Sequence, residues 1–198
     1  MTTFVLATRN AHKVSELRRI LGERLGPHEL VGLDQVPDHG GPEPDEDGAT
    51  FAENALIKAR AAAAHTGLPA IADDSGISVV ALGGAPGIHS ARYAGSRVDA
   101  DNVAHLLANL RGVADRTARF ECAAAIVDGA YEHVELGVWP GAVLEEARGA
   151  GGFGYDPVFR PEGLTVSSAE LTADEKNAQS HRSRAFGALV EVLRARYG

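Results

Sequence analysis

Cysteine is almost absent from this chain, since Cys122 is the only one among 198 residues. A single cysteine excludes an intrachain disulfide and a cysteine-rich zinc site. The first residues have neither the basic segment nor the long apolar segment of a secretory signal, and no stretch approaches the length of a membrane span. We therefore expect a cytoplasmic protein without a membrane partner.

Positive charge is also scarce. The chain has 19 lysines and arginines against 27 aspartates and glutamates, which gives a formal net charge of −8. This balance argues against the broad basic face that binds nucleic acid polymers. A polyanionic ligand must then meet a locally positive pocket or arrive with a metal. Only Lys13, Lys58 and Lys176 are lysines, and a compact ammonium suits a phosphate, although chance could also have kept these three.

The composition and the order of the predicted elements indicate one α/β domain over residues 1–198. Hydrophobic side chains make up 44% of the chain and charged ones 23%, which is ordinary for a globular protein with one core, in two lobes at most. Strands predicted at 3–7, at 29–33 and from 68 to the acids at 73–74 alternate with helices that begin near residues 11 and 51. Runs at 119–128 and 131–139, with a Gly129 turn between them, predict an antiparallel hairpin, followed by a strand at 142–146 and helices at 99–110 and 172–196.

One stretch stands out, because an apolar run from Leu68 ends in Asp73, Asp74, Ser75 and Gly76. A buried strand with this ending brings its acids to the carboxyl edge of a sheet, where open α/β sheets bind ligands. Two adjacent acids suit a metal ion. A solvated turn is the alternative, because Asp, Ser and Gly are also turn residues.

A polar turn directly after the first predicted strand is a candidate phosphate site. It is followed by a helix whose N-cap is expected to be Asn10, and such a helix start offers unpaired backbone N–H groups and a positive dipole end. Lys13 adds a full charge in the first turn. The alternative is a polar loop without a ligand, in which this lysine is incidental. The residues of this turn are Thr8, Arg9, Asn10, Ala11, His12 and Lys13.

The loop at residues 34–48, before the second helix, is acidic, and the simplest interpretation is a loop exposed to solvent. Alternatively, one of its carboxylates shares a metal with Asp74. The sequence Thr50-Phe51-Ala52-Glu53 is a capping box that starts a helix, on which Asn54 and Lys58 are four residues apart and so share one face.

Two later segments carry candidate contacts to a purine nucleotide. In 149–159, glycines alternate with Phe153 and Tyr155, whose rings could stack on a base, and Asp156 could accept hydrogen bonds from a base or sugar; a structural turn is the alternative. The predicted last helix opens with a capping box and places many donors in its first turns. These donors are Lys176, Asn177, Ser180, His181 and Arg182.

Together, four segments resemble the signatures of the inosine/xanthosine triphosphate pyrophosphatase family, which removes non-canonical purine nucleoside triphosphates. The resemblance covers nearly the whole chain in the family's order. The matching segments are Thr8 to Lys13, Asp73-Asp74-Ser75-Gly76, Phe153-Gly154-Tyr155-Asp156-Pro157 and Ser180-His181-Arg182. It implies two lobes around a long mixed central β-sheet flanked by helices, a nucleotide-binding cleft between the lobes, and a homodimer that uses Mg²⁺. The implied reaction is hydrolysis of ITP, dITP and XTP to the monophosphate and pyrophosphate.

The resemblance also implies roles for individual residues. Asp74 matches the catalytic acid and metal ligand, and Glu46 is the best candidate for a second metal carboxylate, with Asp38, Asp45 and Asp47 as competitors. The substrate contacts that it implies are Thr8, Arg9, Asn10, Ala11, His12, Lys13, Ser75, Phe153, Gly154, Tyr155, Asp156, Lys176, His181 and Arg182. His181 and Arg182 are expected near the base. Arg9 and His12 depart from the family's turn, which often has glycine there.

The chemistry expected from these residues is attack of water on the α-phosphorus. We expect Lys58, with Lys13, to neutralise charge on the leaving pyrophosphate, and Asp74 to bind the metal and to accept the water's proton. Asp73 is expected only to orient its neighbour or to cap the strand. A haloacid-dehalogenase-type phosphatase is one alternative, but its Asp-x-Asp spacing is missing here. A non-catalytic nucleotide-binding protein is the other.

Overall fold

The computed structural model describes residues 1–198 apart from the side chain of Glu23. The chain divides into two compact units. Unit 1 comprises Met1–Asp74, Cys122–Gly137 and Arg182–Gly198, and unit 2 comprises Ser75–Glu121 and Val138–His181. With Glu23 set aside, no helix is both long and apolar enough to cross a lipid bilayer.

The strands form a mixed sheet in the order β2-β1-β3-β4-β5-β6. β1 pairs in parallel with β2 and with β3, whereas β6 is antiparallel to β5. The strands are β1 (Thr3–Leu6), β2 (Glu29–Gly32), β3 (Ala70–Val79), β4 (Thr117–Asp128), β5 (Tyr131–Val143) and β6 (Phe159–Pro161). The expected α/β class and mixed sheet are therefore confirmed. The helices are α1 (Ala11–Leu21), α2 (Phe51–Thr66), α3 (Asp99–Asn109), α4 (Ala173–Asn177) and α5 (His181–Tyr197).

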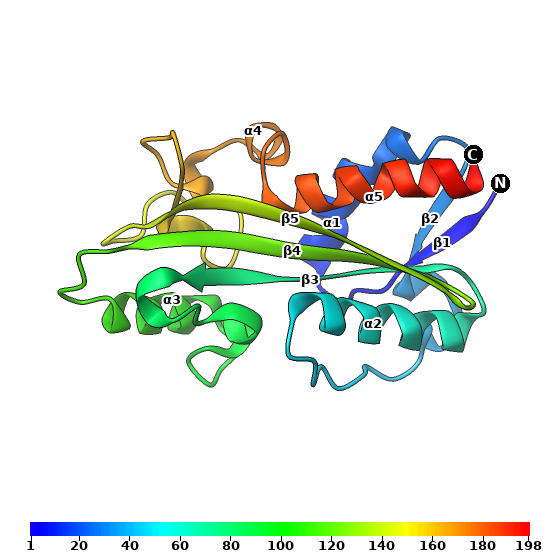
Figure 1. Ribbon diagram of the computed structural model, residues 1–198, viewed down its shortest axis with the longest axis horizontal. Coiled ribbons are helices and arrows are strands. Elements are labelled where there is room, and N and C mark those ends of the chain that lie inside the picture. Colours follow the sequence, from blue (N-terminus) through cyan, green and yellow to red (C-terminus); the bar gives the residue numbers. More distant parts are fainter. The chain divides into compact units, whose positions relative to one another are not determined.

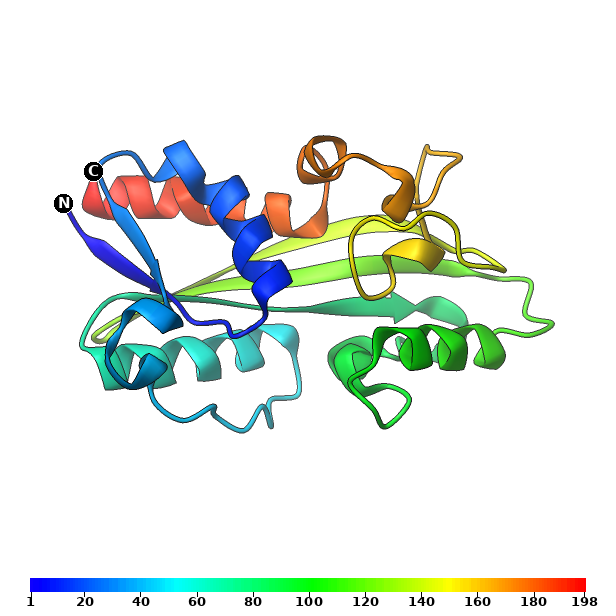
Figure 2. The same ribbon diagram turned by 180° about the vertical axis from the view of Figure 1, so that it is seen from behind.

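In unit 1, helices cover both faces of the strands. Helices α1 and α5 lie on one face and α2 on the other (Figures 1 and 2). Because side chains alternate along a strand, Phe4 and Leu6 of β1 pack with α1 and α5, whereas Val5 packs with α2. Coverage of both faces explains why these strands read as continuous apolar runs.

Unit 2 has its own apolar core. Helix α3 lies on one side of its strand segments and residues 145–178 lie on the other (Figures 1 and 2). The core contains Leu106 and Leu110 from α3 and its C-cap, together with Phe120, Trp139 and Phe159 from the strands, each at most 6% exposed.

Three expectations about the elements were wrong. The third strand of the antiparallel part is 159–161 rather than 142–146, because β5 itself continues to Val143. The helix expected over 172–196 is two helices, α4 and α5. Buried ion pairs hold the two pieces separately, since Lys176 pairs with Asp156 in unit 2 and Arg182 pairs with Asp73 and Glu16 in unit 1. The third error concerns the two acids of β3, which lie within the strand and not at its end.

Candidate functional site

Asp73 and Asp74 lie in the middle of β3, not at its end as the apolar run suggested. The parallel neighbour β1 ends earlier, at Leu6, which pairs with Ile71. The two acids therefore lie beyond the carboxyl end of β1, although their own strand continues. The predicted strand end was wrong, and a ligand site at this edge of the sheet stays a prediction.

Asp74 belongs to a cluster completed by helix α2 and the acidic loop. The Lys58 ammonium donates to Asp74 Oδ1 at 3.0 Å and to Glu46 Oε2 at 3.1 Å. Asn54, one turn before Lys58, donates from Nδ2 to Asp74 Oδ2 at 3.3 Å and accepts the backbone N–H of Gly48 at 2.9 Å. Helix α2 thus fixes both the catalytic candidate and the loop that carries Glu46.

The charges in this cluster do not balance, because Asp74 and Glu46 face a single ammonium. Burial raises the pKa of Asp74, and the charge of Glu46 acts in the same direction, against the opposing charges of Lys58 and Lys13. Burial lowers the pKa of Lys58, but the carboxylates of Asp74, Asp73 and Glu46 outweigh this and hold the pKa above its usual value. A further cation at these two carboxylates would relieve the excess negative charge.

The residues fit a magnesium ion. Mg²⁺ prefers oxygen ligands and is usually held by one or two carboxylates together with substrate phosphates. Asp74 and Glu46 provide such a pair, and the exposed Asp45 and Asp47 flank Glu46 in the loop. Leaving Glu23 aside, the chain brings no three His, Cys, Asp or Glu side chains together as a complete metal cage. Phosphate oxygens and water would have to complete the coordination.

Asp73 has a different environment from its neighbour. Its carboxylate accepts from Lys13 Nζ at 2.9 Å and from Arg182 Nε at 3.4 Å, and the residue is 1% exposed. Arg182 Nη1 also donates to Glu16 at 3.0 Å. Burial would raise the pKa of Asp73, yet the charges of Lys13, Arg182 and Lys58 hold it below its ordinary range. Asp73 therefore ties α1, β3 and α5 together.

The polar turn at residues 8–13 forms as expected, with one difference. Asn10 is the N-cap of α1, and its side-chain oxygen accepts the backbone N–H groups of His12 and Lys13 at 3.0 and 3.2 Å. The expectation of unpaired N–H groups was wrong for these two. The dipole of α1 still favours a phosphate, whereas the Lys13 ammonium at this helix start is paired with Asp73. Arg9 reaches across to the carbonyl of Gly41, at the start of the acidic loop.

In unit 2, a buried ion pair organises the segment around Phe153. The Asp156 carboxylate accepts from Lys176 Nζ at 2.6 Å, from the Phe153 backbone N–H at 2.9 Å and from Ser168 Oγ at 2.8 Å. The Lys176 ammonium also lies 5.1 Å from the centroid of the Phe153 ring. Gly152 permits this arrangement, since its φ is +69° and a Cβ there would lie 2.7 Å from Asp156 Cγ.

Other predicted contacts differ in their exposure. Tyr155 is 5% exposed and donates from its hydroxyl to the carbonyl of Ser90 at 2.8 Å, so the base-stacking expectation narrows to the half-buried Phe153. His181 is 3% exposed, and its ring stacks on Phe120 with centroids 4.8 Å apart. Ser75 follows Asp74 in β3 and is half-buried.

Three residues in these clusters were absent from the predicted site: Asn54, Ser168 and Glu16. The position of Asn54, one turn before Lys58, was a usable signal. Nothing in the sequence linked Ser168 to Asp156 or Glu16 to Arg182, because these pairs are 12 and 166 residues apart.

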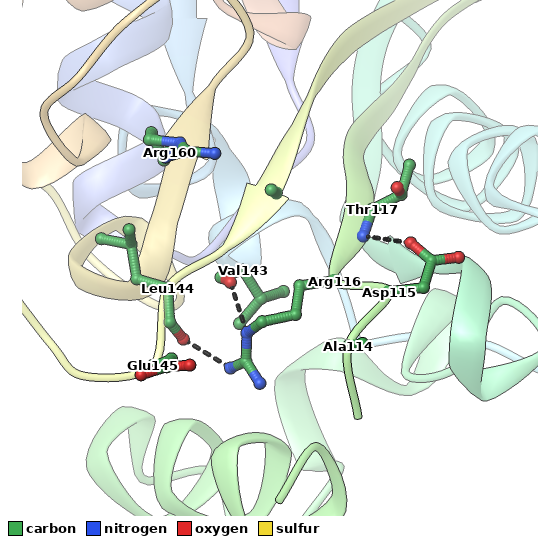
Figure 3. Close-up of a pocket in the computed structure, with 9 residues that line it drawn as sticks. Ala114, Asp115, Arg116, Thr117, Val143, Leu144, Glu145 and Arg160 are labelled. Atoms are coloured by element: carbon green, nitrogen blue, oxygen red, sulfur yellow. Dashed lines mark hydrogen bonds between the residues drawn. The ribbon is translucent and has the colours of Figure 1, made fainter. Parts of the chain in front are cut away.

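A pocket of about 390 Å³ in unit 2 is lined by none of the predicted residues (Figure 3). Its lining includes Arg116, whose guanidinium donates to the carbonyls of Leu110, Val143 and Leu144 at 2.6 to 3.0 Å. These bonds give Arg116 a structural role, since it satisfies carbonyls at the ends of α3 and β5. We assign the pocket no function.

Comparison with known proteins connects these clusters to one family. A profile of the Ham1 family matches residues 4–192. The chain is 54% identical to a dITP/XTP pyrophosphatase of Streptomyces coelicolor, over all of both chains, and 53% identical to one of Leifsonia xyli, over 98% of this chain and 97% of the relative.

Solved structures agree with this match. A HAM1 protein from Coxiella burnetii has a TM-score of 0.89 at 40% identity, over 98% of this chain and all of the other. A nucleoside-triphosphatase, also named a dITP/XTP pyrophosphatase, from Mycobacterium abscessus has a TM-score of 0.77 at 46% identity, over 94% and 98% of the two chains. The chain therefore belongs to the Ham1 family.

Proposed function

We propose that this protein hydrolyses dITP, ITP and XTP to the nucleoside monophosphate and pyrophosphate. The observation that carries the proposal is the Asp74, Lys58 and Glu46 cluster, in a chain that is about half identical to proteins named dITP/XTP pyrophosphatase. Its excess negative charge suits a cation that arrives with a triphosphate. A pure binding protein would gain nothing from two carboxylates near the phosphates, because they repel the substrate unless a metal intervenes.

In this proposal Asp74 and Glu46 hold Mg²⁺. The bound ion would withdraw electrons from phosphate oxygens and lower the pKa of a coordinated water. Asp74 accepts a proton from the attacking water, and Asn54 holds its carboxylate in place. Lys58 and Lys13 neutralise the negative charge that develops on pyrophosphate as it leaves.

Base recognition is assigned to unit 2. Phe153 offers a ring on which a purine can stack, and Lys176, beside that ring, offers a donor for the 6-oxo group. Adenine carries an amino group at this position and would leave the donor unpaired, which costs about 1–3 kcal/mol. This cost discriminates against ATP. We retain Gly154, Tyr155, Asp156 and His181 as residues that shape this part of the site.

The family resemblance implies a position near the base for Arg182, whereas its ion pairs are with Asp73 and Glu16 of unit 1. The ratio of kcat/KM for ITP to that for ATP decides between the two roles. If the Arg182→Ala variant keeps the wild-type ratio, Arg182 has no role in base selection. A ratio that falls about tenfold supports direct recognition of the base.

Two further properties belong to the same proposal: a homodimer and a cytoplasmic location. Sedimentation equilibrium tests the first, and we expect twice the chain mass of 20.7 kDa.

The deciding experiment incubates the protein with ITP in ¹⁸O-labelled water, with Mg²⁺ and then with EDTA. We expect pyrophosphate, with the label in IMP, because water attacks the α-phosphorus. Orthophosphate as the product would indicate a phosphatase of the haloacid-dehalogenase type. A protein that binds ITP without turnover under either condition would be a nucleotide-binding protein, and label in pyrophosphate would move the attack to the β-phosphorus.

A further inference from the structure

The peptide between Phe153 and Gly154 is held by a hydrogen bond to a residue outside its own loop. Within the loop, the Phe153 N–H donates to the Asp156 carboxylate at 2.9 Å. The next N–H, that of Gly154, donates at 2.7 Å to Asp99 Oδ2, a residue 55 positions away on α3. Two successive backbone donors are thus each directed at a carboxylate, which fixes the planes of the two peptides on either side of the Phe153 Cα.

Asp99 is free to make this contact because it does not cap its own helix. The N-cap of α3 is Val98, and Asp99 is the first helical residue. Its carboxylate therefore turns to another segment. A bond between a charged acceptor and a backbone N–H is stronger than a neutral one, and helix α3 supports it with its positive end.

The contact bears on Phe153 more than on Tyr155. Tyr155 is already fixed, because its ring lies in the core of unit 2 and its hydroxyl is bonded to Ser90. Gly154 has a φ of +61°, and because glycine is conformationally permissive, its backbone could adopt other conformations at little cost. Asp99 opposes that freedom at the residue adjacent to the proposed stacking ring.

We infer that Asp99 is a positioning residue, which orients Phe153 for base binding through the backbone N–H of Gly154. The inference rests on the proposed function. It predicts an effect on substrate binding rather than on the chemical step, because Asp99 belongs to unit 2, whereas the residues assigned to the phosphates belong to unit 1.

The test compares Asp99→Ala with Asp101→Ala. Both acids lie in the first turn of α3, and each accepts one strong bond, Asp101 from Ser96 Oγ at 2.8 Å. Both variants lose one favourable charge at the helix start, so their melting temperatures should fall alike. Only Asp99→Ala should raise the KM for dITP, by about tenfold, with kcat within about twofold of wild type. Asp99→Asn keeps an oxygen acceptor, so its KM for dITP should lie close to that of the wild type.

A second readout does not depend on turnover. Hydrogen exchange at the Gly154 amide, followed by NMR, should be faster in Asp99→Ala than in wild type and unchanged in Asp101→Ala. Equal KM values for the two alanine variants would overturn the inference, as would failure of Asp99→Asn to restore binding. A wild-type protein that neither binds nor hydrolyses dITP would instead overturn the proposed function, even if the Gly154 amide behaved as described.

Discussion

At the residue scale, Asp73 and Asp74 show how two identical side chains acquire different roles. They are adjacent in β3 and so point to opposite sides of the strand. Asp73 meets two cations in the interior, while Asp74 shares a single ammonium with Glu46. The sequence indicated that Asp74 was the more important of the pair. The partners of Asp73 could not be predicted, because Arg182 is 109 residues away.

Replacement of Asp74 by Asn should abolish turnover and leave the fold intact. The amide has nearly the same shape but can neither take a proton nor hold a divalent cation well. We expect pyrophosphate release from ITP to fall at least about a thousandfold. The melting temperature should stay level or rise, because burial disfavours the charge that the variant removes. Near-normal hydrolysis by this variant would contradict the assignment.

Replacement of Asp73 by Asn should have its main effect on stability. The variant removes the carboxylate that pairs with Lys13 and leaves the buried Arg182 with Glu16 alone, which we expect to lower the free energy of unfolding by about 3–5 kcal/mol. Urea denaturation at pH 7 measures the loss, with Asp74→Asn as the matched control. Equal stability of the two variants would show that the ion pairs around Asp73 contribute little.

The same ion pairs give a pH dependence with a definite sign. The pKa of Asp73 is lower in the folded protein than its ordinary value of 3.8, so the folded state favours the carboxylate. Its contribution is fully present above that value and declines as the pH falls through the folded pKa. The difference in unfolding free energy between wild type and Asp73→Asn should therefore shrink below about pH 4. A difference that grows in acid would contradict the sign.

At the scale of elements, α2 is the helix that the sequence predicted best. Its capping box at Thr50 formed as expected, and the helix ends at Gly67, its C-cap. Ala55, Ala59 and Ala62 are at most 3% exposed and pack on alanines of β3 and β4. This close approach lets the short Asn54 side chain reach Asp74.

The packing of α2 leaves no room for larger side chains. Ala59→Leu should therefore lower the free energy of unfolding by about 1–3 kcal/mol, because extra methyl groups displace the helix from the sheet. Ala64→Leu makes the same change at an exposed position of the same helix and should be nearly neutral. Chemical denaturation of both variants checks the prediction, and equal losses would argue against tight packing at Ala59.

Elements were mispredicted where long-range contacts outweighed the local pattern. The two acids of β3 read as a strand end, yet the strand continues to Val79 because Ile77 and Val79 enter the core of unit 2. The strand at 159–161 has only three residues, too few for a clear alternation. Local sequence cannot report such contacts, so it gave the number and type of the main elements better than their ends.

For the molecule as a whole, the predicted site residues divide between the two units according to their expected chemistry. Glu46, Lys58 and Asp74 belong to unit 1, whereas Phe153, Asp156 and Lys176 belong to unit 2. The motifs made the set of residues predictable, since each is short and local. The ion pairs that join them in each unit were not, because they depend on the folded chain.

This division predicts that catalysis and base selection can be altered separately. Glu46→Gln should lower kcat/KM for ITP and ATP by the same factor and raise the Mg²⁺ concentration needed for half-maximal activity, while the control Asp45→Asn should change neither. Lys176→Met should instead lower the ITP to ATP preference about tenfold, through the loss of one donor to the 6-oxo group. Steady-state rates on both substrates give the ratios. A changed ITP to ATP ratio in Glu46→Gln, or an unchanged ratio in Lys176→Met, would contradict the assignment of catalysis to unit 1 and of base selection to unit 2.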